Sequence, residues 1–455
     1  MQPNKRILLL TTTLSSFLTP FMASSINLAL PSIGKDFAAD AITLTWIPTI
    51  YLLAAAVFLL PLGKLADIHG RRKFFIAGIL IFTFGSFLCA VANTTSMLLL
   101  FRVIQGFGGA MIFGTGVALL SSVFPLEERG KVLGINTGSV YLGASLGPVL
   151  GGVLTQHFTW RSIFFFNVVL GIIVAVLAII YLKFELNPAK GEKFDIAGSF
   201  IYGIALVFLL VGLSELSDGN GIYFLVLGIF GIGAFASFEL RSAHPLINLR
   251  IFRKNTVFSY SSLATFINYA ATAGVGFLMS LYLQYAKGLS PQSAGFIILS
   301  QALVMTAVAP VAGRLSDRIE PRIISSAGMG CTFLALISLA MVDVSTSLFL
   351  VVPVLALFGV GLGLFSSPNA NAIMSSVERK QYGLASATIA TMRIVGQMTS
   401  LAITMLCVAI FIGKVEITAA QIPNLITTMK TVLIIFAGLC FFGIFASLRR
   451  GNLRG

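Results

Sequence analysis

The chain has 455 residues, of which 57% are hydrophobic and only 10% charged, whereas a soluble domain carries roughly 25% charged residues. This composition excludes a protein that meets water over most of its surface. The net charge of +14 does not indicate a nucleic-acid partner, because the basic residues form short clusters between apolar runs instead of one basic face or tail.

Apolar runs of about 20 residues, the length that crosses a hydrocarbon core ~30 Å thick, recur along the chain. We predict membrane-spanning helices at residues 7–31, 44–62, 74–92, 98–123, 132–154, 162–182, 196–213, 221–239, 257–284, 293–313, 323–342, 347–374, 383–412 and 429–447. The first run is too long for a signal peptide. We therefore expect an all-α polytopic membrane protein with fourteen spans, or twelve without the short seventh and eighth.

The basic residues divide unequally between the two sets of alternate loops. One set, which includes both termini, holds 23 of the 30 Lys and Arg residues, whereas the other holds Lys35, Arg161, Lys287, Lys414 and Lys430. Cytoplasmic loops carry the excess of Lys and Arg in membrane proteins. We therefore predict a multi-pass protein of the cell (plasma or inner) membrane with both termini in the cytoplasm.

A short motif occurs twice in the chain, at an offset of 250 residues. The repeated positions are Gly63, Leu65, Asp67 and Arg72 after the second span and Gly313, Leu315, Asp317 and Arg322 after the tenth. Duplicated halves of this kind are a transporter architecture. We expect an N-terminal six-helix bundle at 1–185, an inserted two-helix hairpin with its linkers at 186–245, and a C-terminal six-helix bundle at 246–455.

The first copy of the motif combines an acid with a cluster of bases in one short turn. In a partly dry interface Asp67 can pair with an arginine and accept from helix N-terminal N–H groups, which makes a latch that breaks when helices part. A merely basic cytoplasmic turn is the alternative for Arg71, Arg72 and Lys73 taken alone. The latch residues that we predict are Gly63, Asp67, Gly70, Arg71, Arg72, Gly313, Asp317 and Arg322.

Several motifs resemble those of one transporter family. GKLADIHGRRK at 63–73 is similar to the loop signature G-x-L-a-D-r-x-G-r-[RK] of the major facilitator superfamily. The family's fourth-span pattern is matched by Leu98, Arg102, Gln105, Gly106, Gly108 and Ala110, and its fifth-span pattern G-x-x-x-G-P-x-x-G-G resembles GASLGPVLGG at 143–152. The residues Trp160-Arg161, Phe166-Asn167 and FDIAG at 194–198 resemble the fourteen-span drug:proton antiporter branch.

The resemblance implies a secondary transporter in which two six-helix bundles rock about a central cavity. In the family the fifth-span motif is associated with export, and the fourth-span arginine with proton coupling. We therefore expect export of small hydrophobic or amphipathic compounds, as in multidrug efflux, by exchange with protons. A membrane sensor that keeps this fold without moving solute is an alternative of another class.

Two arginines lie inside predicted spans, where a charge costs roughly 2.5 to 3.5 kcal/mol on insertion scales. Arg102 is expected to face a cavity, water or a partner, with Gln105 close to the same helix face. Snorkelling of Arg102 to the membrane surface is the alternative. The coupling or cavity residues that we predict are Asn27, Arg102, Gln105, Asn136, Tyr141, Arg393 and Gln397.

Glycines recur every fourth residue in the fifth span and line one helix face, where missing side chains let another helix approach. Pro148 removes a backbone hydrogen bond and is expected to kink the helix or act as a hinge. The residues assigned to packing or a kink are Gly143, Gly147, Pro148, Gly151 and Gly152. Ordinary tight packing explains the glycines as well as a moving hinge does.

The first span departs from the pattern of the antiporter branch. The branch usually has an acid where this chain has Met22, and no acidic residue lies at the middle of a predicted span. An exporter of cations commonly needs a buried carboxylate that exchanges a proton for its substrate. The intramembrane arginines favour neutral, amphipathic or anionic substrates, and a facilitator or anion-linked carrier without proton coupling stays an alternative.

The sequence lacks the signatures of an enzyme or an ATP-driven pump, since neither a GxxxxGK[ST] loop nor an HExxH helix occurs. The four cysteines lie far apart in apolar runs, without the spacing of a metal or redox site. We therefore expect no enzymatic activity, no metal or cofactor, and no nucleic acid or obligate protein partner. The expected partners are a small-molecule substrate, protons and the lipid bilayer.

Overall fold

The computed structural model describes residues 4–216, 220–242, 245–247, 249–316, 318–378 and 381–451, apart from the side chains of residues 126, 127 and 130. Within these ranges all regular secondary structure is helical, and 14 helices are long and apolar enough to cross a membrane. Each predicted span coincides with one of these helices, so the all-α polytopic architecture is confirmed.

The 14 long helices are α1 (Lys5–Phe37), α2 (Ala41–His69), α3 (Arg71–Ala90), α4 (Thr95–Val123), α5 (Leu126–His157), α6 (Arg161–Tyr181), α7 (Ile196–Ser214), α8 (Gly221–Arg241), α10 (Thr256–Leu281), α11 (Pro291–Ser316), α12 (Pro321–Ala340), α13 (Leu348–Ser375), α14 (Tyr382–Phe411) and α15 (Ile422–Arg449). Three short elements complete the described structure, namely α9 (Arg250–Lys254), the π-helix η2 (Tyr282–Ala286) and the 3₁₀ turn η4 (Ala419–Gln421). Helices suit such apolar runs because lipid offers no hydrogen bonds to the backbone.

Polar side chains set where several helices begin. Thr94 accepts a hydrogen bond from the Met97 N–H at the start of α4, at 3.2 Å. Asp195 accepts a hydrogen bond from the Gly198 N–H at the start of α7, at 2.7 Å. Asn255 accepts one from the Phe258 N–H at the start of α10. Each side chain satisfies one of the N–H groups that a first helical turn leaves without a partner.

The chain divides into two compact units, which we call unit 1 and unit 2. Unit 1 comprises Met1–Ala23, Trp46–Ala144 and Thr159–Leu249, and unit 2 comprises Ser24–Thr45, Ser145–Phe158 and Arg250–Gly455. The helices α1, α2 and α5 contribute to both units, and the α7–α8 hairpin belongs to unit 1. The division into two six-helix bundles and an inserted hairpin stays a prediction.

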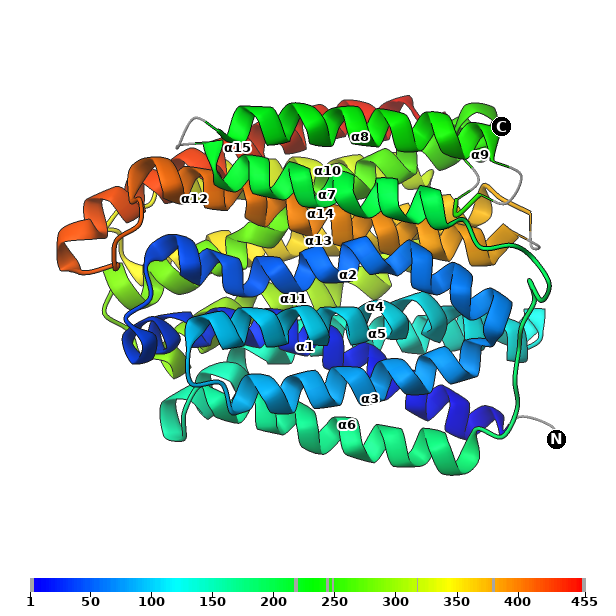
Figure 1. Ribbon diagram of the computed structural model, residues 1–455. Coiled ribbons are helices and arrows are strands. Elements are labelled where there is room, and N and C mark those ends of the chain that lie inside the picture. The colour runs from blue at the N-terminus through cyan, green and yellow to red at the C-terminus, as the bar shows by residue number, and fades with distance from the viewer. Residues whose placement is uncertain are drawn as a thin grey trace. The chain divides into compact units, whose positions relative to one another are not determined.

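In unit 1, α3 packs between α4 and α6, and α7 runs beside α8 (Figure 1). Glycines permit the closest approaches, since a Cβ atom on Gly106 of α4 would lie 2.5 Å from the Tyr51 carbonyl oxygen of α2. The hairpin is attached to α2 by a hydrogen bond of 3.1 Å from the Tyr202 hydroxyl to the Ala56 carbonyl oxygen. Side chains at the centre of this unit are therefore enclosed by closely spaced helices.

Unit 2 joins the helices of the second half of the chain to the later turns of α1 and α5. Ser280 Oγ donates to the Asn27 carbonyl oxygen of α1 at 2.6 Å, and Ser145 of α5 contacts Thr306 of α11 at 3.3 Å. A Cβ atom on Gly152 would lie 2.5 Å from the Pro291 carbonyl oxygen. The glycine at the end of the fifth-span motif therefore lies directly against α11.

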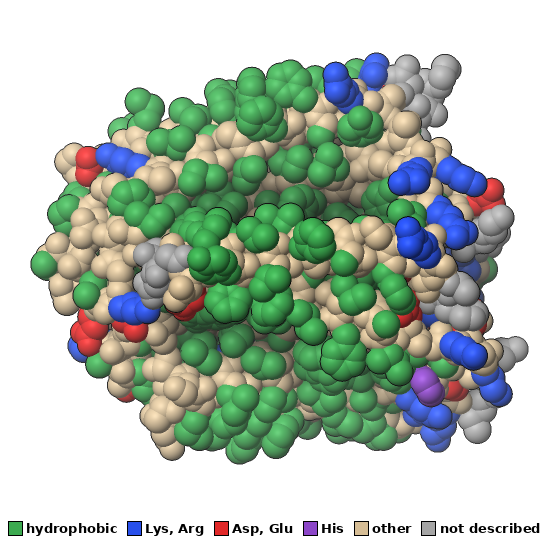
Figure 2. Space-filling model, turned by 45° about the horizontal axis from the view of Figure 1, so that its top comes forward, with side chains coloured by type: hydrophobic (Ala, Val, Ile, Leu, Met, Phe, Trp, Pro, Cys, Tyr) green, Lys and Arg blue, Asp and Glu red, His purple; other side chains and the backbone are tan. Residues whose placement is uncertain are grey.

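Large apolar side chains are exposed along the helices, as the face in Figure 2 shows, and Lys and Arg gather near the helix ends. In the hairpin, Phe200 is 66% exposed and Phe230 is 79% exposed. In water such a surface would favour aggregation, whereas in a bilayer it faces hydrocarbon chains. The exposed surface therefore agrees with a membrane-spanning protein.

Substitution of Gly143 tests whether α5 needs a bare face against α1. An alanine Cβ there would collide with the Phe17 carbonyl oxygen and lie 3.2 Å from Phe21 N, so Gly143→Ala should cost about 1 to 3 kcal/mol by overpacking. On the same helix a Cβ on Gly138 would meet nothing within 4 Å, and Gly138→Ala should be neutral or slightly stabilising. Thermal unfolding in detergent compares the two variants, and equal midpoints would contradict this packing.

Candidate functional site

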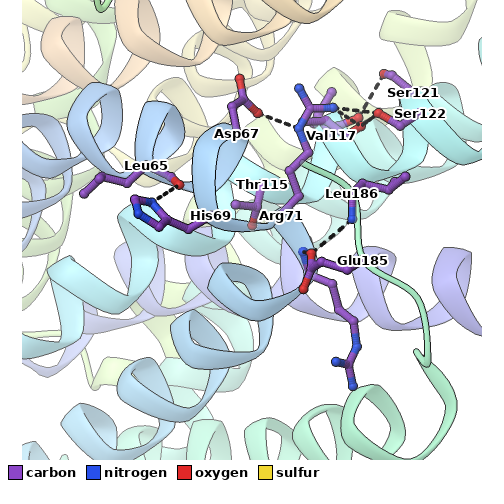
Figure 3. A network of polar contacts seen from close by, with 12 residues as sticks. Leu65, Asp67, His69, Arg71, Thr115, Val117, Ser121, Ser122, Glu185 and Leu186 are labelled. Atoms are coloured by element: carbon purple, nitrogen blue, oxygen red, sulfur yellow. Dashed lines mark hydrogen bonds and ion pairs between the residues drawn. The ribbon is translucent and has the colours of Figure 1, made fainter. Parts of the chain in front are cut away.

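The turn between α2 and α3 holds Arg71 in a network of polar contacts (Figure 3). Arg71 Nε donates to Asp67 Oδ1 at 2.6 Å, one turn earlier in sequence. Arg71 Nη1 donates to Ser122 Oγ at 2.6 Å and to the Ala118 carbonyl oxygen at 3.2 Å, both near the end of α4. One guanidinium therefore joins three helices of unit 1 at this end.

The connector at residues 182–195, between α6 and α7, lies across the same turn. Glu185 Oε1 accepts from the Arg72 N–H at 2.9 Å and from the Leu186 N–H at 3.1 Å. The Ala189 N–H donates to the Asp67 carbonyl oxygen at 3.0 Å, and Lys64 pairs with Glu192 at 2.7 Å. The connector therefore closes over the turn with charged and backbone contacts, which the sequence motifs did not indicate.

Gly70 is required where the connector crosses the turn. Its φ of 125° lies in the left-handed region, and a Cβ atom there would lie 2.5 Å from the carboxyl carbon of Glu185. Gly63, by contrast, has nothing within 4 Å of a Cβ position.

In the second copy of the motif, Gly313 lies against Ser367 of α13, and Arg322 is half-buried in the first turn of α12. Asp317 lies outside the described residues.

Arg102 of α4 is fully buried in unit 1. Its Nη1 donates to Gln105 Oε1 at 2.6 Å, and Nε donates to the Ile47 carbonyl oxygen of α2 at 3.2 Å. Gln105 Nε2 in turn donates to Ser86 Oγ of α3 at 2.7 Å. Arg102 therefore lies away from the surface, within a chain of hydrogen bonds across three helices.

The surroundings of Arg102 leave part of its guanidinium unsatisfied. The Tyr51 ring lies over the guanidinium carbon at 4.5 Å and supplies a cation–π contact. Nη2, however, is buried without a hydrogen-bond partner among the described residues. A desolvated donor of this kind costs free energy unless a bound group accepts from it, so it is a candidate for contact with a substrate or with water.

The other predicted cavity residues of unit 1 connect helices. Asn136 of α5 is buried and donates to Ser16 Oγ of α1 at 2.8 Å, while Tyr141 is half-buried. Met22 is fully buried, and its sulfur accepts from Asn167 Nδ2 of α6 at 3.3 Å. The position that carries an acid in the antiporter branch is therefore a weakly polar contact here.

In unit 2 the predicted residues are more dispersed. Asn27 is half-buried, and the Oδ1 atom of its side chain is buried without a hydrogen-bond partner in the described chain. Arg393 of α14 hydrogen-bonds to Tyr269 of α10, and Gln397 is half-buried on the same face of α14. Gly151 lies against Ser25, and Gly147 and Pro148 are buried within α5.

Arg450 follows α15 directly and is one of the basic residues at the C-terminal end, but the structure buries it almost completely. Its Nη1 donates to Asn369 Oδ1 of α13 at 2.8 Å and to Ser261 Oγ of α10 at 3.3 Å. Burial lowers the pKa of the Arg450 guanidinium to about 10, and the Glu320 carboxylate opposes this change. The group stays charged at neutral pH and attaches the end of α15 to two other helices.

Comparisons with known proteins agree on a family. The family model described as Major Facilitator Superfamily matches residues 12–400 and 261–452. The riboflavin transporter RibZ of Clostridioides difficile (strain 630) is 33% identical over 392 residues, which are 86% of this chain and 85% of that protein. The multidrug resistance protein Stp of Mycobacterium tuberculosis (strain CDC 1551 / Oshkosh) is 30% identical over 409 residues, covering 89% of this chain and 76% of that one.

Solved structures share the fold at lower sequence identity. A bacterial homolog of the human lysosomal transporter Spinster, in an inward-facing and unoccupied conformation, matches with a TM-score of 0.69 and 16% identity over 99% of both chains. The human organic anion transporter MFSD10 matches with a TM-score of 0.68 and 14% identity, covering 98% of this chain and 100% of that one. At these identities the likeness concerns the fold alone.

The contact of Glu185 with the α2–α3 turn can be tested by limited proteolysis. Glu185→Ala leaves two N–H groups without their acceptor, so the connector should open more often and a Lys-specific protease should cut it at least about fivefold faster. The matched control is Glu128→Ala, which removes an exposed ion pair with Lys5 outside the connector, worth ~0 to 1 kcal/mol. Equal cleavage rates in Glu185→Ala and the wild type would show that Glu185 does not hold the connector.

Proposed function

This chain belongs to the Major Facilitator Superfamily, and we propose that it exports small amphipathic compounds by alternating access, in exchange for protons. The direction is supported by the fifth-span motif and by relatives named for resistance, which include the tetracenomycin C resistance and export protein of Streptomyces glaucescens at 28% identity over 79% of this chain and 68% of that one. RibZ is named as a riboflavin transporter, so a planar organic compound is also a candidate substrate.

The buried cation Arg102 is the observation that carries the proposed substrate class. One donor atom of its guanidinium, Nη2, has no hydrogen-bond partner in the described part of the chain. Gln105 accepts from the other donor, Nη1, and itself donates to Ser86. Among the described residues, the acids of the long helices lie near helix ends, as Asp36, Asp67 and Glu239 do. A positive interior favours neutral or anionic amphipathic substrates over cations.

A carrier without proton exchange is the second candidate function, and Met22 favours it. The side chain is buried and in contact with Asn167, so no carboxylate is available at that position to exchange a proton for a substrate.

The unequal distribution of Lys and Arg between alternate loops supports a cell-membrane orientation with both termini in the cytoplasm. In this orientation the α2–α3 turn with Asp67 and Arg71 would act as a cytoplasmic latch.

Transport assays in reconstituted vesicles separate the candidate functions. Neutral, anionic and cationic amphipathic dyes are offered to vesicles with an acidic interior, with protein-free vesicles as the control. The proposal expects several-fold accumulation of neutral or anionic dyes, abolished when a protonophore collapses the pH gradient. Uptake that only equilibrates and ignores the gradient would indicate the facilitator, and no uptake of any dye would favour a non-transporting sensor.

Arg102→Met tests whether the buried guanidinium serves transport or only the fold. Arg102→Met removes a cation whose burial costs several kcal/mol, which offsets the ~1 to 3 kcal/mol lost when Gln105 Oε1 is left without a donor. The variant should therefore unfold at the same or a higher temperature, while transport falls by about tenfold or more, the equivalent of ~1.4 kcal/mol.

Lys131→Met is the control for Arg102→Met, because it removes an exposed cation at the start of the α5 span. This control should retain both stability and transport. A folded Arg102→Met variant with wild-type transport would refute the role of Arg102, and so would a loss of transport that follows the loss of folded protein.

A further inference from the structure

Glu239 is a buried carboxylate that the proposed transport mechanism does not use. It lies in the last turn of α8, within the hairpin, and is only 2% exposed. Its Oε2 accepts from the Ile247 N–H at 3.4 Å, a long hydrogen bond. Its Oε1 is buried without any hydrogen-bond partner in the described part of the chain. The Leu246 N–H also acts on the carboxylate, so Oε1 is the oxygen that lacks a donor for its share of the negative charge.

A second carboxylate borders the same space. Asp195 caps α7, where Oδ1 accepts from the Gly198 N–H at 2.7 Å and Oδ2 accepts from Ser242 Oγ at 3.2 Å. A Cβ atom on Gly198 would lie 2.8 Å from Asp195 Oδ2 and 2.9 Å from Glu239 Oε1. Both carboxylate oxygens therefore occupy the space beside Gly198 that a side chain would need, and we call this space the gap.

The charges around this gap do not balance if both acids are ionised. The charged side chains that act on Glu239 are Asp195 at the start of α7 and Lys64 near the end of α2. Lys64 is already paired with the Glu192 carboxylate of the connector at 2.7 Å. One ammonium group therefore acts on both the Glu239 and the Glu192 carboxylates, while Asp195 lies beside Glu239. Two like charges beside each other in a partly dry site disfavour double ionisation.

We propose that Glu239 and Asp195 form a proton-binding site that holds one proton between them at neutral pH. The proton resides on Glu239 Oε1, from which it is directed at Asp195 Oδ2. This arrangement supplies the partner that Oε1 lacks and halves the negative charge at the gap. The ligand is a proton whether or not transport is itself coupled to protons, so the proposal stands apart from the proposed function.

Release of this proton would reach the α2–α3 turn through Lys64. A second negative charge at the gap competes with Glu192 for the Lys64 ammonium group. Lys64 lies in α2, one helical turn before Asp67. Weakening of the Lys64–Glu192 pair frees one of the contacts that hold the connector. The hairpin therefore acts as a proton sensor for the turn to which the connector is bound.

Infrared spectroscopy of the purified protein tests the site directly. At neutral pH the wild type should show the carbonyl band of a protonated carboxylic acid, which shifts on exchange into D2O, and Glu239→Gln should lack that band. Glu215→Gln, which removes a carboxyl group at the opposite end of the same hairpin, should keep it. Absence of the band from the wild type, or its persistence in Glu239→Gln, would overturn the proposal.

Two further variants keep the test decisive if Glu239→Gln fails to fold. Asp195→Asn retains a helix-capping side chain but removes its charge, so the pH at which the band disappears should fall by about one unit. Lys64→Met removes the ammonium group that acts on Glu239, so the same midpoint should rise. Midpoints that stay at the wild-type value in both variants, or that move in the same direction, would refute a proton shared at this gap.

Discussion

The cost of placing charge in hydrocarbon is the constraint on which the rest of this structure depends. The guanidinium of Arg102 can exist inside a span only because the Ile47 carbonyl oxygen, Gln105 and the Tyr51 ring surround it. These partners come close because α4 presents glycines to its neighbours, as Gly106 does to α2. Close helix packing and the buried charge are therefore one arrangement, and a larger residue in place of Gly106 would separate the charge from its partners.

The spans could be predicted because hydropathy depends on local composition, whereas the site could be predicted only in part. The pairing of Arg102 with Gln105 follows from their spacing on one helix, but Ser86 and the Ile47 carbonyl belong to other helices and no spacing identifies them. The burial of Arg450 could not be predicted, because a count of basic residues does not register a side chain that turns back between α10 and α13. The connector contacts depend on backbone groups and on the φ of Gly70, which leave little trace in composition.

The connector that leads into the hairpin contacts the motif at residues 63–73, although the two are far apart in the sequence. Residues 182–195 lead directly into α7, and on the way they contact the turn that carries Asp67 and Arg71. The hairpin is also attached to α2 through Tyr202. Because both attachments lie within unit 1, the hairpin is part of that unit's packing.

The placement of acids separates two tasks that one carboxylate often combines. A mid-span acid both pairs with a cationic substrate and carries the exchanged proton, but Met22 cannot do either. Arg102 is suited to pairing with a neutral or anionic substrate, since a group of that kind can accept a hydrogen bond from Nη2, which has no partner among the described residues. A proton at Glu239, near the end of α8, would then regulate the packing of the hairpin and the connector instead of being exchanged for substrate at one site. In the proposed mechanism, coupling would depend on conformation, because the charge proposed to meet the substrate and the group proposed to titrate lie on different helices.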